Sequence, residues 1–483
     1  QYKRLKIMAT IIEQKPLYTQ TPVGQDVIFT VSNSNIVSTQ TRVKFQAEVH
    51  ISNTFIPNTA VADDVVGYFK TTPNNAGVGI FNLRSVVENY VSADNMARLN
   101  SSYKGTTTND DERHPIHLID KYSGNINAIR YLVIQFKTEY LDNVQFLPGG
   151  AANPTYNQLI QVEAANSSTF QIFNGYLSYA DKLERGVAPF QANFGYNVGK
   201  FNLSAASNQF LTNAPVTQYA NLDDYGTVGI LAPNDNLSYI RLTYKDSSGS
   251  ALGNESINRT QVNGAYDNFN AYIGMNLLYF GCFPANLRNH SSTFQALVTA
   301  GTINGGSIEV TPFDASASQI GQQYTIKLNC PDLKGYESIR LCWLNQWGVW
   351  DYYTFTKKST KNITTQGSTY EQLEGTWNES TYKLDSFKGG KKAFRVNSME
   401  KISMNTDYIT ESESVWLEEL INSPEVYQLN GFQTDSAFAY LNTYVTPVRL
   451  TTTSYTRKTI ANDKLIQYTF EVEKTKTLRT QAI

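Results

Sequence analysis

The sequence predicts a mainly β protein made of several β-sandwich domains, fibronectin- or immunoglobulin-like, with a few short helices. Three observations predict this class. Charged residues are only 17% of the chain, below the quarter usual in soluble globular domains. The 31 tyrosines and many threonines favour pleated, half-buried surfaces. Short segments of alternating apolar and polar residues also recur between polar turns.

At 483 residues the chain is too long for one ordinary hydrophobic core, so we expect about three domains. The first is an N-terminal β-sandwich over residues 1–147. The Gly/Pro/Asn stretch at 147–154 predicts a linker, followed by a middle β-domain over residues 148–330. A C-terminal β-domain over residues 331–483 would contain one inserted helix at about 411–423.

The first region contains the clearest single strand. Between residues 42 and 51, apolar and polar residues alternate strictly, which predicts a half-buried strand of an antiparallel sheet. The predicted inward residues are Val43, Phe45, Ala47, Val49 and Ile51. A short helix is expected at 84–90, a polar loop at 101–116 and a further strand at 131–140. In the middle region, Ile240, Leu242 and Tyr244 alternate in the same way.

The last region contains a strand, a turn and a capped helix. Residues 338–345 are expected to form a strand that turns at Gly348 into an aromatic strand ending at Phe355. Thr410 and Glu413 have the spacing of a capping box, and Ser423-Pro424 ends the predicted helix. The apolar face of this helix is formed by Trp416, Leu417, Leu420 and Ile421. Strands at 447–450 and 464–472 complete the domain.

Charge and hydropathy argue against several classes of partner. The formal net charge is −2 and no long basic block occurs, so we expect no nucleic-acid partner. No apolar run reaches 18 residues, so we expect no membrane insertion. The apolar stretch at 8–12 is too short for a signal peptide. Met8 is a plausible start codon, which would place residues 1–7 outside the fold.

The sequence shows no motif for catalysis, a metal or a cofactor, and we predict a non-enzymatic protein. Cys282, Cys330 and Cys342 are expected to be free thiols, typical of a reducing cytoplasm. His114 and His117 are interpreted as solvated loop residues rather than metal ligands. The carboxylates Asp223, Asp224 and Asp407 leave a glycosidase pair open, because the distance in space decides that chemistry.

An aromatic cluster around residue 350 has two interpretations. Trp343 is expected to point into the core with its strand. Trp347, Trp350 and Tyr352 either pack the turn or form an exposed contact surface for a sugar or a protein. We keep both interpretations open for these three residues.

The order of sequence blocks resembles a group of tail-associated virion proteins from phages of marine bacteria and of Bacteroidetes. The similarity is strongest after residue 338 and weaker upstream. The blocks that carry it are Leu344–Tyr352, Thr406-Asp407, Glu413–Leu420, Ser423–Tyr427, Thr446–Leu450 and Leu465–Phe470, with Val27–Phe29, Gly79–Leu83 and Phe210–Pro215 upstream. The resemblance implies a virion structural protein and assigns no binding residues.

Together these observations predict a virion component of the tail or tail tip, assembled in the host bacterial cytoplasm. We expect a homo-oligomer that contacts other tail proteins and contributes to host attachment through a cell-surface glycan or protein. The alternatives are a glycan-binding adhesin or receptor-binding protein, a polysaccharide depolymerase, and, among structural proteins, a head decoration or connector protein.

Overall fold

The computed structural model describes residues 9–53, 65–98, 113–119, 122–125, 127–141, 159–178, 181–187, 193–232, 236–258, 276–329, 335–378, 380–432, 444–457 and 466–482. Strands make up 48% and helices 13% of this part of the chain, which confirms a mainly β protein with several sheets and few short helices. The expected linker at 147–154, most of the loop at 101–116, Cys330 and residues 1–7 lie outside the described residues.

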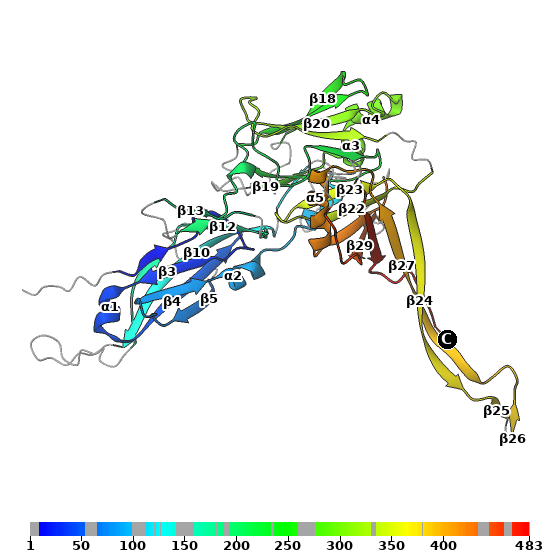
Figure 1. The fold of residues 1–483 in the computed structure, drawn as a ribbon, viewed down its shortest axis with the longest axis horizontal. Helices are drawn as coiled ribbons and strands as arrows, with labels where there is room; N and C mark the ends of the chain where they lie inside the picture. Colours follow the sequence, from blue (N-terminus) through cyan, green and yellow to red (C-terminus); the bar gives the residue numbers. More distant parts are fainter. Residues whose placement is uncertain are drawn as a thin grey trace, which may run out of the picture.

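The N-terminal part consists of two sheets that share one core (Figure 1). The first has the order β1 (Ile11–Gln14), β3 (Ile28–Ser32), β6 (Val78–Asn82). The second has the order β2 (Gln20–Pro22), β12 (Phe170–Phe173), β10 (Ile129–Leu141), β4 (Thr41–Ser52), β5 (Val65–Thr71), and β11 (Leu159–Asn166) also pairs with β10. The fibronectin- or immunoglobulin-like identity of these sheets stays a prediction.

Strand β4 confirms the predicted inward face but not the predicted solvent face. Phe45, Ala47 and Val49 are fully buried in the core. The polar residues between them, Gln46 and Glu48, are buried too. On that second face Lys137 of β10 forms an ion pair with Glu48 at 2.5 Å. The strand is therefore buried on both faces from Phe45 onward, while Arg42 and Lys44 at its start are exposed as predicted.

The strand pairing crosses the expected domain boundary at residue 147. β11 and β12 follow the boundary in sequence but pair with β10, which precedes it. β9 (Tyr122–Gly124) precedes the boundary but pairs with β19 (Asn276–Phe280) of the middle region. The reason is that hydrogen bonding along β10 requires partners from both sides of the linker region, which composition alone does not reveal.

The middle part holds a five-stranded sheet, a three-stranded sheet and two helices. The larger sheet has the order β15 (Thr217–Ala220), β21 (Tyr324–Leu328), β20 (Ser307–Phe313), β17 (Tyr239–Lys245), β18 (Ala251–Asn258). The smaller places β19 between β16 (Val228–Ala232) and β9. α3 (Pro284–His290) and α4 (Ser292–Ala300) follow β19. Ile240, Leu242 and Tyr244 are fully buried, which confirms the alternation predicted for β17.

The C-terminal part is an eight-stranded sheet with one docked helix. Its order is β23 (Trp350–Phe355), β22 (Ile339–Leu344), β28 (Val426–Leu429), β29 (Val445–Leu450), β30 (Thr469–Lys474), β27 (Gly390–Asn405), β24 (Ser359–Gln372), and β31 (Arg479–Ala482) also pairs with β27. α5 (Glu411–Asn422) begins with the predicted capping box of Thr410 and Glu413. Trp416, Leu417 and Leu420 are buried against the sheet, as the sequence predicts.

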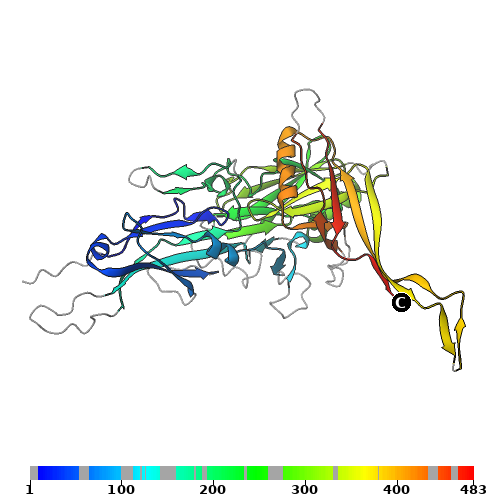
Figure 2. The ribbon, with the colours of Figure 1, turned by 60° about the horizontal axis from the view of Figure 1, so that its bottom comes forward.

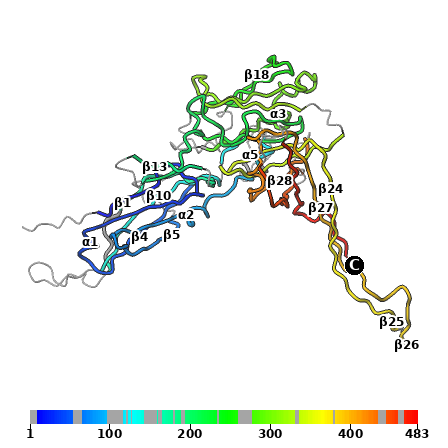
Figure 3. Tube along the Cα trace, in the orientation of Figure 1, coloured from blue at the N-terminus to red at the C-terminus, as the bar shows by residue number. Residues whose placement is uncertain are grey.

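Two strands of this sheet extend far beyond the body. β24 and β27 pair from Ser359 and Met404 to Gln372 and Gly390, with one register shift between Ser368 and Thr369. β25 (Gly375–Asn378) and β26 (Thr381–Leu384) form a second, short hairpin at the end. Figures 1 and 2 show this hairpin leaving the molecule away from the N-terminal sheets, and the trace in Figure 3 follows it to β25 and β26. We call residues 359–405 the arm and residues 373–395 its tip.

Candidate interaction surface

The aromatic turn that follows β22 is fixed by short contacts. The Asn345 side-chain oxygen accepts hydrogen bonds from the backbone N–H groups of Trp347, at 2.9 Å, and Val349, at 3.2 Å. Gly348 has φ +79°, and a Cβ at this position would lie 2.1 Å from the carbonyl oxygen of Asn174. The turn therefore docks directly on the backbone that follows β12.

The contact surface proposed for Trp347, Trp350 and Tyr352 is wrong, because all three side chains lie inside the protein. Trp347 is 1% exposed and its ring stacks on Tyr196 with 5.3 Å between centroids. The polar atoms of all three side chains form hydrogen bonds with distant segments. Trp347 Nε1 donates to Asn213 at 3.2 Å, and Trp350 Nε1 donates to the carbonyl of Asp94 at 2.6 Å. The Tyr352 hydroxyl lies 2.9 Å from Thr227 Oγ1. The sequence could not show which of these segments would cover the turn.

His117 is also in the core rather than in a solvated loop. Its Nδ1 lies 2.9 Å from the Tyr352 hydroxyl and its Nε2 lies 3.5 Å from Cys342 Sγ. Burial, and secondarily the charge of Arg340, lowers the pKa of His117 to about 3. Burial raises the pKa of the Cys342 thiol. A reactive cysteine needs a lowered pKa, so this neutral pair suits packing rather than nucleophilic catalysis. The side chain of His114 lies outside the described residues.

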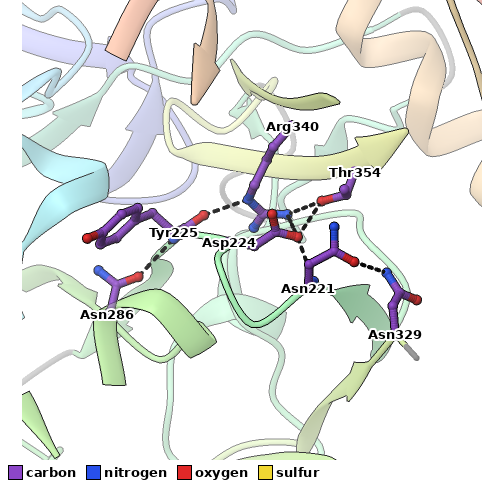
Figure 4. Close-up of polar contacts among 8 residues, drawn as sticks. Asn221, Asp224, Tyr225, Asn286, Asn329, Arg340 and Thr354 are labelled. Carbon is purple, nitrogen blue, oxygen red and sulfur yellow. Dashed lines mark hydrogen bonds and ion pairs between the residues drawn. The ribbon is translucent and has the colours of Figure 1, made fainter. Parts of the chain in front are cut away.

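A buried ion pair joins the C-terminal sheet to the middle part (Figure 4). Arg340 of β22 donates from Nη1 to Thr354 Oγ1 at 2.7 Å and from Nε to the carbonyl of Tyr225 at 2.6 Å. Its Nη1 lies 3.5 Å from Asp224 Oδ2. Asp224 also accepts from Thr354 Oγ1 and from the backbone N–H of Asn221, both at 2.7 Å. Asp224 is thus a structural counterion.

The other two carboxylates of the open glycosidase interpretation each pair with a cation. Asp223 pairs with Arg288, and Asp407 lies 2.9 Å from Lys357 Nζ. A catalytic carboxylate pair requires two such groups on opposite sides of one bond. Each of these carboxylates instead faces a basic side chain.

A second pair of acids, not expected from the sequence, lies where α5 docks. Asp351 of β23 accepts from Thr212 Oγ1 at 2.6 Å and from Trp416 Nε1 at 2.7 Å. Glu419 of α5 accepts from Asn213 Nδ2 at 2.6 Å. Burial raises the pKa of Asp351 to about 6. Burial, together with the charge of Asp351, raises the pKa of Glu419 to about 8.

The enclosed space beside Asp351 is small. A cavity of about 20 Å³ lies between the 210–212 segment, β16 and β23. A space of this size holds about one water molecule. Its lining includes Asp351, Thr212, Thr227 and Tyr352, so Asp351 faces a space of the size of one water molecule.

The arm is the most exposed feature of the described part of the chain. Along β24 nearly every residue is exposed, on both faces of the ribbon. Its exposed side chains are mostly short and polar, including Thr360, Asn362, Thr364, Thr365, Gln366, Ser368 and Thr369. At about 3.3 Å per residue, the fourteen residues of β24 span roughly 45 Å.

The tip differs from the rest of the arm, because large apolar side chains gather there. Trp377 is 66% exposed and Leu384 75% exposed. The other exposed apolar residues of the tip are Leu373, Tyr382, Phe387 and Phe394. Such a concentration of aromatic and aliphatic surface is typical of an interaction site.

The tip has a defined fold of its own. The Asp385 backbone N–H donates to the carbonyl of Glu374 at 2.9 Å, and Thr376 Oγ1 donates to Asp385 Oδ2 at 3.1 Å. Gly389 has φ +93°, and a Cβ there would lie 2.5 Å from Glu374 Cγ. The chain therefore turns back tightly under the hairpin and presents its apolar residues outward.

The arm is not predicted from the sequence. Two signals could have indicated it: the consecutive glycines 389 and 390, and a polar strand that runs into a cluster of Trp, Tyr, Leu and Phe. A strand with polar residues on both faces does not show the alternation by which half-buried strands are recognised.

Comparison with known proteins adds no family. No protein-family model matches the sequence, and no curated protein matches it significantly. None of the described helices is long and apolar enough to cross a bilayer. Among the residues that the structure describes, no group of three or more His, Cys, Asp or Glu side chains is placed to hold a metal ion.

Proposed function

We propose that this chain is a structural protein of a bacteriophage tail, present in multiple copies and contributing to host attachment. The order of sequence blocks shared with tail-associated virion proteins supports the setting. The observation that carries the proposal is the arm, in which the exposed polar strand β24 leads to an apolar tip.

The arm requires a partner for its stability. A two-stranded ribbon is marginally stable by itself in water. A tip with several large apolar side chains in water is unfavourable by roughly 25 cal/mol for each Å² exposed. Packing of the arm against another subunit, as in an assembled particle, would stabilise the ribbon and remove the apolar side chains of the tip from water.

The buried polar groups support a structural role over an enzymatic one. Asp224 neutralises Arg340, and His117 and Cys342 are held in neutral form. The glycan-binding alternative drew on Trp347, Trp350 and Tyr352, which are packed inside the chain. Trp347, Trp350 and Tyr352 belong to the hydrophobic core that the C-terminal strands share with the middle part.

Gold-labelled antibodies against the full chain, applied to purified particles, test the proposal. We expect label on the tail, and peptides of the chain in mass spectra of the same particles in a ratio of several copies per particle. Label on the capsid would favour a head decoration protein. Particles that contain no such peptides would contradict the proposal.

A further inference from the structure

We propose that the arm tip of one copy docks on the outer face of α5 of a second copy. This inference rests on the proposed multi-copy assembly and names the two surfaces that meet.

The tip offers a basic and apolar surface. The tip contains five basic side chains, Lys383, Lys388, Lys391, Lys392 and Arg395, and three acidic ones, Glu374, Glu379 and Asp385, so it has an excess of two positive charges. Lys383 and Lys391 are exposed and stand near Leu384 and Phe394 in sequence. A partner surface should therefore be acidic with an apolar centre.

The face of α5 that points away from the sheet has this character. Residues 402–448 contain seven Asp or Glu and no Lys, Arg or His. On α5 the exposed positions include Glu411 and Val415, one turn apart, and Tyr408 is exposed just before the helix. Asp407 and Glu418 are neutralised by Lys357 and Arg457. On α5 itself, Glu411 and Glu413 have no ion pair in the described contacts and lie at the start of the helix, whereas Glu419 is buried where the helix docks.

The two surfaces do not meet within one chain. In Figures 1 and 2 the arm runs outward from the sheet that α5 covers, and its tip lies far from the helix. A contact between tip and α5 must therefore join different copies. Such a head-to-tail contact uses two different surfaces on each copy and builds a ring when the rotation closes.

A second copy fits the arm better than a partner present only at the host surface. The ribbon and the apolar tip need cover from the time of assembly, and other copies of the chain are present at that time. The basic charge of the tip segment also matches the acidic 402–448 segment of the same sequence.

Engineered cysteines test the docking directly. Full-length chains with Leu384→Cys and Val415→Cys, both in a Cys330→Ser background, are mixed and oxidised, and the products are separated without reductant. We expect a covalent pair that contains one chain of each variant, with a yield at least fivefold above that of the control. The control combines Leu384→Cys with Val187→Cys, since Val187 is 84% exposed and lies in the segment next to β13 (Glu184–Arg185).

The outcomes separate this inference from the proposed function. Equal yields with Val415→Cys and Val187→Cys, or products formed only between two tips, would overturn the docking. If the chain is present in the tail but the cross-link fails, the docking alone is wrong. If the cross-link forms but particles lack the chain, the tail assignment alone is wrong.

Charge reversal gives an independent measurement. We expect self-association of the full chain to weaken by about tenfold in the double variant Lys383→Glu, Lys391→Glu. The single variant Glu411→Lys should show a loss of the same size. A chain that carries all three substitutions should recover most of that loss. Lys182→Glu, an exposed change outside both surfaces, should have no effect. Purely additive losses would overturn the pairing. A second experiment mixes the chain with anionic lipid vesicles. If the chain pellets with the vesicles and Trp377→Ser abolishes this, the partner of the tip is a lipid surface and the docking on α5 is overturned.

Discussion

Gly348 marks the closest approach between the C-terminal aromatic turn and the N-terminal part of the chain. Two separate obstacles exclude a side chain at this position. One is the positive φ, and the other is the carbonyl oxygen of Asn174, which would lie 2.1 Å from a Cβ. The first is a backbone cost, and the second requires the two segments to move apart.

Gly348→Ala should lower the free energy of unfolding by about 3 kcal/mol, because it combines backbone strain with a steric clash. Urea denaturation measures this loss. Gly249→Ala is the matched control: Gly249 has φ +88° but no atom within 4 Å of a Cβ, so its cost should be about 1 kcal/mol. Equal losses for the two variants would show that the contact with Asn174 is unimportant.

The acid pair makes stability depend on pH. Asp351 and Glu419 have folded pKa values raised to about 6 and about 8, so between about pH 4 and pH 8 the folded state binds more protons than the unfolded state. Stability from this pair is complete below pH 4 and is lost as the pH rises through 8.

We therefore expect the free energy of unfolding to fall between pH 5 and pH 9, and Glu419→Gln to flatten this dependence. Urea denaturation at a series of pH values measures the slope. Glu411→Gln removes an exposed carboxylate at the start of the same helix and should keep the slope of the native chain. A Glu419→Gln variant with an unchanged slope would contradict the assignment.

At the scale of elements, α5 and the arm show what sequence patterns can and cannot predict. The helix was predictable, because the Thr410–Glu413 capping box and the apolar spacing of Trp416 and Leu420 are local signals. The burial of Glu419 was not, because it depends on Asn213, about two hundred residues away in sequence. The arm lacked any pattern that distinguishes a projecting ribbon from an ordinary loop.

The arm should be separable from the stability of the body. Replacing residues 367–396 with Asn-Gly joins Gln366 to Asn397, which are paired in the native ribbon, through a two-residue hairpin turn. We expect the free energy of unfolding to change by about 1 kcal/mol or less, since β24 buries little surface, while self-association is lost.

Analytical ultracentrifugation of the full-length and shortened chains checks this expectation. Thr364→Ala with Thr365→Ala changes β24 outside the tip and keeps the tip itself, and this control should associate as the native chain does. A shortened chain that still associates would place the contact between copies elsewhere on the body.

At the scale of the whole molecule, the three hydrophobic cores are joined by contacts that the sequence could not reveal. The mainly β class and the identity of many strands followed from alternation. The partners of β9, β11 and β12 did not, because pairing between distant strands is set by contacts along the whole of β10 and β19. Arg340 forms one such link, between β22 and the segment at 224–225.

Arg340→Met should destabilise the chain by about 3–5 kcal/mol, because it leaves Asp224 as an unpaired buried charge. Adding Asp224→Asn should restore part of this stability. Arg288→Met, which breaks the more exposed pair with Asp223, should cost less than about 1 kcal/mol. Calorimetry would show whether the middle and C-terminal parts still unfold in one transition. A loss for Arg340→Met no larger than that for Arg288→Met would contradict a structural role for this pair.

The arm's connection to the sheet has a mechanical consequence. Both strands of the ribbon enter the body at the same end, so a pull on the tip along the arm is carried by two covalent backbones in parallel. At the root, β27 is hydrogen-bonded to β30 from Lys401 to Asn405, and those bonds lie across the direction of pull. They would be loaded together in shear instead of opening one after another, and a contact at the tip would transmit tension to the C-terminal sheet.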